Sequence, residues 1–198
     1  MATQLGLYNA ALTEVGDRAL VSLDENREPR RVLDTVYADT VRDCLEQGQW
    51  NFALRSVRLD ADGDVTPAFG FAHIFDKPDD WVRTVGLSAS ETFAPPLARY
   101  HDEAGVWAAD MTPIFARYVS SGGAYGLDLN AWPRSFARLV ELTLAFRVCE
   151  RLAHSGGLAQ RLARDAGDAL RIALNRDAMN EAPPRLRPPG AWTRARAG

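Results

Sequence analysis

The sequence predicts a mainly α-helical protein with a β-rich insertion, and therefore the α+β class. Apolar residues recur at helical spacing near both ends of the chain, whereas the middle alternates with the period of a strand. With 198 residues, of which 46% are hydrophobic, the chain can bury a core. We expect an antiparallel helical bundle, a small β domain and an extended basic C-terminal arm, with the bounds 1–49 and 127–182, 50–126, and 183–198 respectively.

Two helices are predicted between residues 3 and 48. Thr3 is a suitable N-cap for the first, and Gly16 can adopt the left-handed conformation that ends it. Pro29 fits the first turn of the second helix, where its missing N–H costs no hydrogen bond. Gly48 is expected to end that helix. Its apolar stripe is Val32, Leu33, Val36, Tyr37, Thr40, Val41, Cys44 and Leu45, and its charged face, which we interpret as solvated surface, is Arg31, Asp34, Asp39, Arg42, Asp43 and Glu46.

The β-rich insertion is predicted to begin at Trp50. Trp50, Phe52 and Leu54 alternate, which indicates an extended segment with both aromatics on one side. These rings are expected to pin the insertion onto the helical core. Further along, two extended segments flank a turn at Pro78, residues 102–105 form the tip of a hairpin, and "PIFARYVSS" alternates like a half-buried strand.

Helices are predicted again from about Pro133. The first of them carries so many apolar residues that we expect it to be central; Ser155 to Gly157 break it, and a last helix runs to about Asn180. From Pro183 the composition becomes proline-rich and basic without an acid. Two interpretations stay open, a disordered end or an arm that docks on a neighbour through Arg185, Leu186, Arg187, Trp192, Arg194 and Arg196.

The short motifs favour structural roles over catalysis. The acidic run 60–64 lacks the spacing of an EF-hand and is interpreted as a turn. The glycines at 122–126 have no Lys-Ser/Thr pair beside them, so they are interpreted as a linker. Asp79 and Asp80 are expected to cap a turn rather than act as a paired acid and base. The remaining candidates are scattered histidines and cysteines on apolar stripes, His73, His101, His154, Cys44 and Cys149.

Neither a catalytic constellation nor a cofactor or metal site emerges from these residues. The N-terminus has no basic and apolar pattern of a signal peptide, and no apolar run approaches the ~18 residues of a membrane helix. We therefore expect a non-enzymatic protein that is made in the cytoplasm and does not bind a membrane.

The order of the segments resembles a known family. A helix in "LYNAALTEVGDRALVSLDE", a second helix ending in "QGQWNFA", an aromatic stretch "FGFAHIFDKPDDWVR", a strand "FARYV" and two long helices follow one another along nearly the whole chain. This order is similar to that of the head-to-tail adaptor proteins of tailed phages, also called tail tubular protein A, gatekeeper or head-completion proteins. The best marks are Trp50, Asn51, Phe52, Pro78, Asp80, Trp81 and Arg83. The tail here is longer and richer in arginine than the family pattern.

The resemblance implies a structural protein of the virion, located at the head-tail junction. Such adaptors bind below the portal as a ring, usually of twelve copies, extend the DNA channel and provide the attachment site for a tail nozzle or other tail protein. The C-terminal arm is then expected to reach toward the portal. Double-stranded DNA would pass through the lumen without sequence-specific binding, which suits a chain of net charge −3.

Two other classes of function are retained. One is a small regulatory or nucleic-acid-binding module that uses the arginine-rich tail, for which salt-dependent DNA binding is the expected property. The other is an enzyme whose site has no recognised pattern. Neither explains the order of the motifs.

Overall fold

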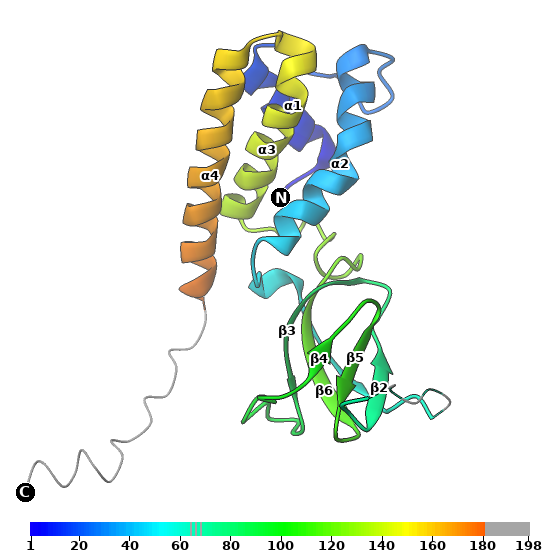
Figure 1. Cartoon of the computed structure of the whole chain (residues 1–198). Coiled ribbons are helices and arrows are strands. Elements are labelled where there is room, and N and C mark those ends of the chain that lie inside the picture. The colour runs from blue at the N-terminus through cyan, green and yellow to red at the C-terminus, as the bar shows by residue number, and fades with distance from the viewer. Residues whose placement is uncertain (64, 66, 68, 181–198) are drawn as a thin grey trace, which may run out of the picture.

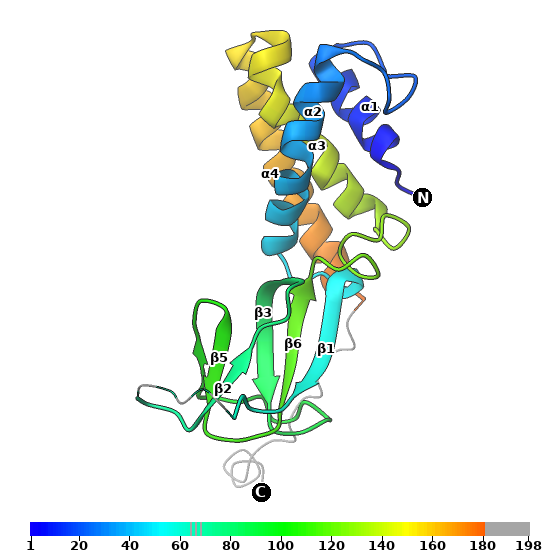
Figure 2. The ribbon, with the colours of Figure 1, turned by 90° about the vertical axis from the view of Figure 1, so that its right-hand side faces the viewer.

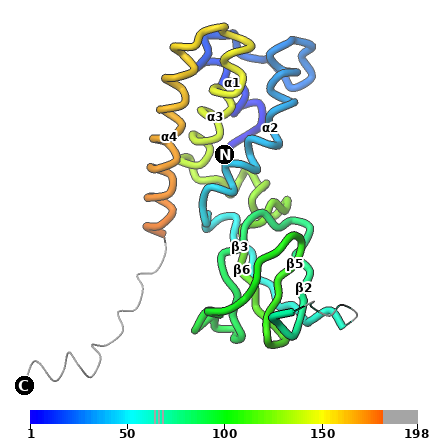
Figure 3. The backbone as a smooth tube through the Cα atoms, in the orientation of Figure 1, coloured from blue at the N-terminus to red at the C-terminus, as the bar shows by residue number. Residues whose placement is uncertain are grey.

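The computed structural model describes residues 1–63, 65, 67 and 69–180. Four α-helices and two small antiparallel sheets lie within these residues, which confirms the mixed α+β class. Helices occupy one end of an elongated molecule and strands the other (Figure 1). The tube in Figure 3 shows the chain leaving the helical end after the second helix, folding the strands, and returning for the last two helices.

The first helix, α1 (Gln4–Val15), begins and ends as predicted. The Thr3 hydroxyl accepts a hydrogen bond from the Gly6 N–H at 3.1 Å, and Gly16 has the left-handed φ of 78°. The second helix, α2 (Glu28–Glu46), carries Pro29 in its first turn.

Gly48 does not end α2 in the predicted way. The helix stops at Glu46, and the following Gln47 keeps a right-handed conformation. The requirement for glycine at position 48 is steric instead. A Cβ there would lie 2.7 Å from Trp50 Cε2 and 2.8 Å from Leu174 Cδ2, closer than real contacts allow. Gly48 therefore permits the close approach of an aromatic ring and the last helix.

The third helix, α3 (Arg134–Ala153), is central as expected, because α1, α2 and α4 (Gly156–Ala178) all pack against it. The break before α4 lies at His154, whose φ of 49° is left-handed, and at Ser155, whose side chain caps α4. The two following glycines belong to the first turn of α4. Phe146 departs from the apolar stripe of α3, since it is 43% exposed.

The strands form two sheets of three. One has the order β1 (Leu54–Leu59), β6 (Ile114–Ser120), β3 (Trp81–Ser88), and the other the order β2 (His73–Asp76), β5 (Val106–Ala109), β4 (His101–Asp102). The predicted hairpin is therefore the pair β4–β5, and the predicted strand "PIFARYVSS" is β6, at the centre of its sheet. The two segments that flank Pro78 are strands, but they belong to different sheets (Figure 2).

The extended segment predicted from Trp50 is wrong at its start. Residues Asn51–Ala53 form a turn of 3₁₀-helix, closed by a hydrogen bond from the Ala53 N–H to the Trp50 carbonyl at 2.9 Å. Trp50 and Phe52 are therefore not alternate residues of a strand, and β1 begins only at Leu54.

The molecule has two apolar cores. The larger lies among the helices and includes Trp50 together with Val82 and Val119 from the sheet. The smaller lies between the two sheets, around Phe75, Leu87, Trp107, Ile114 and Tyr118. Within the described residues, none of the helices has both the length and the apolar character needed to cross a membrane.

Candidate functional site

The residues that carry the family resemblance lie where the helices meet the first sheet. Trp50 is 1% exposed, and its indole N–H donates to the Cys44 carbonyl at 2.9 Å. Its ring meets that of Phe136 edge-on, with 4.9 Å between centroids, and the centroid of the Phe52 ring lies 4.8 Å from that of Phe136. Aromatic pairs at these distances stabilise beyond the area they bury. Trp50 and Phe52 thus attach the start of the β part to α3.

Asn51 joins this attachment to the end of α4. Its backbone N–H donates to the Asp177 carboxylate, at 3.1 and 3.2 Å to the two oxygens, and its side-chain amide donates to the Asp177 carbonyl at 2.9 Å. A carboxylate in the last turn of a helix is disfavoured by the helix dipole. The two donors of Asn51 offset that cost, so the last turn of α4 is held against the junction.

Asp80 is the centre of a polar cluster at the helix-facing end of the sheet. Its carboxylate accepts hydrogen bonds from Arg55 at 2.9 Å, from the Tyr118 hydroxyl at 2.9 Å, and from the Ser120 hydroxyl. The Ser121 N–H also donates to the Asp80 carbonyl at 2.7 Å. Asp80, which directly precedes β3, therefore links the start of that strand to β1 and β6.

The predicted turn-capping role is wrong for Asp80. The turn before β3 is closed by the backbone, through the Trp81 N–H and the Pro78 carbonyl at 2.9 Å. Partial burial would raise the pKa of the Asp80 carboxyl, but hydrogen bonds from Ser120, Arg55 and Tyr118 outweigh it and lower the pKa. Burial and the neighbouring carboxylate raise the pKa of Tyr118. Asp80 is thus ionised and Tyr118 neutral near neutral pH.

Trp81 contributes to a buried cation site that the sequence did not predict. The Lys77 ammonium lies 3.9 Å from the centroid of the Trp81 ring and donates to the Asp102 carboxylate at 2.6 Å. The Lys77 side chain is only 4% exposed. The indoles of Trp81 and Trp107 both donate to the Thr84 hydroxyl, at 3.1 and 2.9 Å. Burial would raise the pKa of the Asp102 carboxyl, but its bonds with Lys77 lower it. These contacts fasten the β4–β5 hairpin to β3.

Arg83 faces the end of α2. Its guanidinium donates to the Glu46 carbonyl at 3.2 Å, so it caps one of the free carbonyls at that helix end. It also borders an open hollow of about 460 Å³ between α2 and α4, whose other walls include Gln47, Gly48, Leu174 and Asn175. This hollow lies beside the last turn of α4.

The other predicted binding residues, Arg185, Leu186, Arg187, Trp192, Arg194 and Arg196, lie outside the described residues. The described chain ends at Asn180, two residues beyond α4. The anchor of Asn51 on Asp177 therefore fixes the position of the last turn of α4.

The remaining reactive side chains do not converge. Cys44 and Cys149 are buried, and burial raises the pKa of the Cys44 thiol to about 11, which leaves it protonated. His73 and His101 belong to the second sheet, whereas His154 follows α3. Among the described residues, no group of three His, Cys, Asp or Glu side chains could hold a metal ion.

Comparison with known proteins adds no family to this geometry. No protein-family model matches the chain, and no curated protein matches it.

Proposed function

We propose that the protein is a head-to-tail adaptor of a tailed-phage virion, without catalytic activity. Copies form a ring that binds below the portal, extends the DNA channel and offers an attachment site to tail components. One observation carries the proposal. The two marks of the family resemblance, residues 50–52 and 78–83, are the residues that build the junction between helices and sheet.

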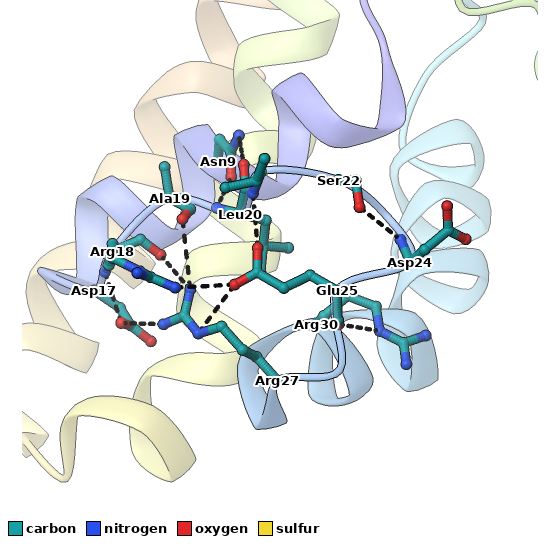
Figure 4. A network of polar contacts seen from close by, with 11 residues as sticks. Asn9, Asp17, Arg18, Ala19, Leu20, Ser22, Asp24, Glu25, Arg27 and Arg30 are labelled. Atoms are coloured by element: carbon teal, nitrogen blue, oxygen red, sulfur yellow. Dashed lines mark hydrogen bonds and ion pairs between the residues drawn. The ribbon is translucent and has the colours of Figure 1, made fainter.

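The shape of the chain supports a role between two different partners. At the helical end, the loop between α1 and α2 is held by a dense polar network (Figure 4). Asn9 exchanges two hydrogen bonds with the Leu20 backbone, at 2.7 and 3.0 Å, while Arg27 binds Asp17 at 3.1 Å and also approaches Glu25. In this proposal, the ordered loop faces the portal.

The opposite end offers a different surface. Loops of the β part expose large apolar side chains, among them Phe69 at 82% and Met111 at 37%. Exposed apolar groups in loops are frequent at sites of protein contact. We assign this end to the tail nozzle or another tail protein.

The C-terminal arm supplies the second contact of the proposal. Its arginines, with Trp192 as apolar anchor, would bind the portal or a neighbouring copy. The test is a deletion of residues 183–198, compared with the full chain. We expect unchanged helix content and melting, with loss of attachment to portal rings encoded by the same genome, as imaged by electron cryomicroscopy. Particles that assemble normally with the shortened chain would refute the role of the arm.

The ring and the rival function are tested separately. The full chain mixed with portal rings should give a closed ring below the portal in the same images, and a chain that never joins the portal would refute the proposal. A nucleic-acid-binding module would instead bind duplex DNA as the isolated chain, with an affinity that falls steeply as salt rises.

A further inference from the structure

We propose that adjacent copies in the ring meet through the outer faces of α2 and α4, with α2 of one copy against α4 of the next. This inference rests on the proposed ring and names the surfaces that would close it. Figure 1 shows α2 and α4 on opposite sides of α3. A closed ring needs such a heterologous contact, in which two different surfaces of one subunit are complementary.

The two outer faces carry opposite net charge. The exposed charged residues of α2 are four acids and two arginines, Glu28, Asp34, Asp39, Glu46, Arg31 and Arg42. Those of α4 are four arginines and one acid, Arg161, Arg164, Arg171, Arg176 and Asp168. A contact between two copies through the same face would oppose like charges, whereas α2 against α4 opposes unlike charges. Charge complementarity therefore favours head-to-tail packing over a two-fold dimer.

Some of these charges have no partner of opposite sign within the subunit. In the described part of the chain, Asp39 makes neither a hydrogen bond nor an ion pair, and Arg164 contacts only the Gln160 carbonyl, at 3.4 Å. Small residues lie beside them on the same exposed faces, Ala38 next to Asp39 and Ala163 next to Arg164. The two helices could therefore approach closely, and each would supply the counter-charge that the other lacks.

The spacing of the charges also matches. Asp39 and Glu46 are seven residues apart on α2, and Arg164 and Arg171 are seven apart on α4, so each pair spans about 10.5 Å on one stripe. Both helices run from the loop end toward the sheet (Figures 1 and 2).

The levels of the two pairs follow from the contact between Leu174 of α4 and Gly48, which lies two residues beyond the end of α2. A Cβ at Gly48 would touch Leu174, which puts these positions at one level. Counting back along each helix brings Glu46 level with Arg171, and Asp39 level with Arg164, to within about one helical turn of 5.4 Å. A neighbour at the same height would thus present matching charges.

Charge reversal on each face tests the contact. One variant carries Asp39→Arg and Glu46→Arg, and the other carries Arg164→Glu and Arg171→Glu. Each variant alone opposes like charges at every interface. We therefore expect the protein concentration at which half of the chains are assembled to rise at least about tenfold, as measured by sedimentation velocity at low salt. Mixed in equal amounts, the variants can alternate around a ring and restore unlike charges at every interface. The mixture should therefore assemble like the unaltered chain.

A control for the α2 variant carries the same charge change away from these faces. Asp76→Arg with Glu91→Arg alters two exposed acids of the β part and should assemble normally. If the two face variants assemble normally, or if their mixture does not assemble, the proposed contact is wrong. Neither result would contradict the ring itself. If the unaltered chain forms no ring, either alone or on portal rings, the adaptor proposal fails as well.

Cross-linking gives a second readout that does not depend on affinity. A chain with both Asp39→Cys and Arg164→Cys, treated with a short bismaleimide, should give a ladder of multimers on a denaturing gel. Either cysteine alone should give monomers, because the partner position has no thiol. The native Cys44 and Cys149 are fully buried and stay unmodified in the folded chain. Dimers from a single-cysteine chain, or the absence of a ladder under conditions in which the unaltered chain assembles, would overturn the proposal.

Discussion

The two sides of the junction between helices and sheet are held by different chemistry. On the Trp50 side, the buried Trp50 ring and the partly buried Phe52 ring pack against Phe136 in the larger apolar core. On the Asp80 side, one carboxylate gathers three donors from two strands, and the Arg55 side chain among them is 37% exposed. Apolar burial is insensitive to pH and salt, whereas a charged cluster near the surface responds to both. The junction therefore combines an apolar attachment that changes little with pH and a polar attachment that depends on the charge of Asp80.

Trp50→Ala should lower the free energy of unfolding more than the substitutions at Asp80 and Asn51. Truncating a buried aromatic side chain typically costs about 3–5 kcal/mol, and here the Cys44 carbonyl also loses its donor. Denaturant unfolding of the isolated chain measures the loss. A variant with normal melting that nevertheless failed to bind the portal would show that Trp50 is an interface residue instead of a core residue.

Asp80→Ala should cost less, about 2–3 kcal/mol. The substitution leaves the hydroxyls of Tyr118 and Ser120 and the guanidinium of Arg55 without their common acceptor. Asp79→Ala is the matched control, because within the described residues the neighbouring carboxylate makes none of these bonds to β1 or β6. Equal loss in the two variants would mean that the cluster around Asp80 adds nothing specific.

The pH dependence separates the two sides of the junction. The folded-state pKa of Asp80 lies below its unfolded value, so its stabilisation is complete above that unfolded value, near pH 4, and is lost as the pH falls through the folded-state pKa. The difference in unfolding free energy between the unaltered chain and Asp80→Asn should therefore shrink in acid. The deficit of Trp50→Ala should stay nearly constant over the same range. Parallel pH profiles for the two variants would contradict the distinction.

Asn51→Ala should have the smallest effect, about 1 kcal/mol. The substitution removes the hydrogen bond from the side-chain amide to the Asp177 carbonyl. The backbone N–H of residue 51 still donates to the Asp177 carboxylate. The loss should be local. Hydrogen exchange is expected to accelerate in the last turn of α4 and to stay unchanged in α3. Uniform acceleration along both helices would show that Asn51 supports the whole bundle rather than the end of α4.

Local chemistry made the helix starts and the strands predictable. Thr3, Gly16 and Pro29 act on residues next to them in the chain, and the alternation in the first part of β6 reports burial on one face of the strand. The turn at residues 51–53 was missed because its conformation depends on Trp50 and Phe52 meeting Phe136, far along the chain. Gly48 was assigned to the correct region for the wrong reason, since its neighbour in α4 is 126 residues away.

The polar contacts of the site depend even more on tertiary structure. The sequence marked Asp80 as noteworthy but could not show that Arg55, Tyr118 and Ser120 would surround it, since the strand register brings them together. Lys77 lies in the aromatic stretch that carries the family resemblance, but nothing in that stretch indicated a buried cation. The one clue was composition, because Lys77 is the single lysine of a chain that otherwise uses arginine.

The burial of Lys77 has a practical consequence for work on this protein. It is the single lysine of the chain, and its amine is enclosed by Trp81 and Asp102, with only 4% of the side chain exposed. Amine-directed dyes and biotin esters should therefore react poorly with Lys77 in the native chain. For the same reason, aldehyde fixatives should couple poorly through this residue, so stabilising assemblies for imaging calls for reagents that couple carboxylates.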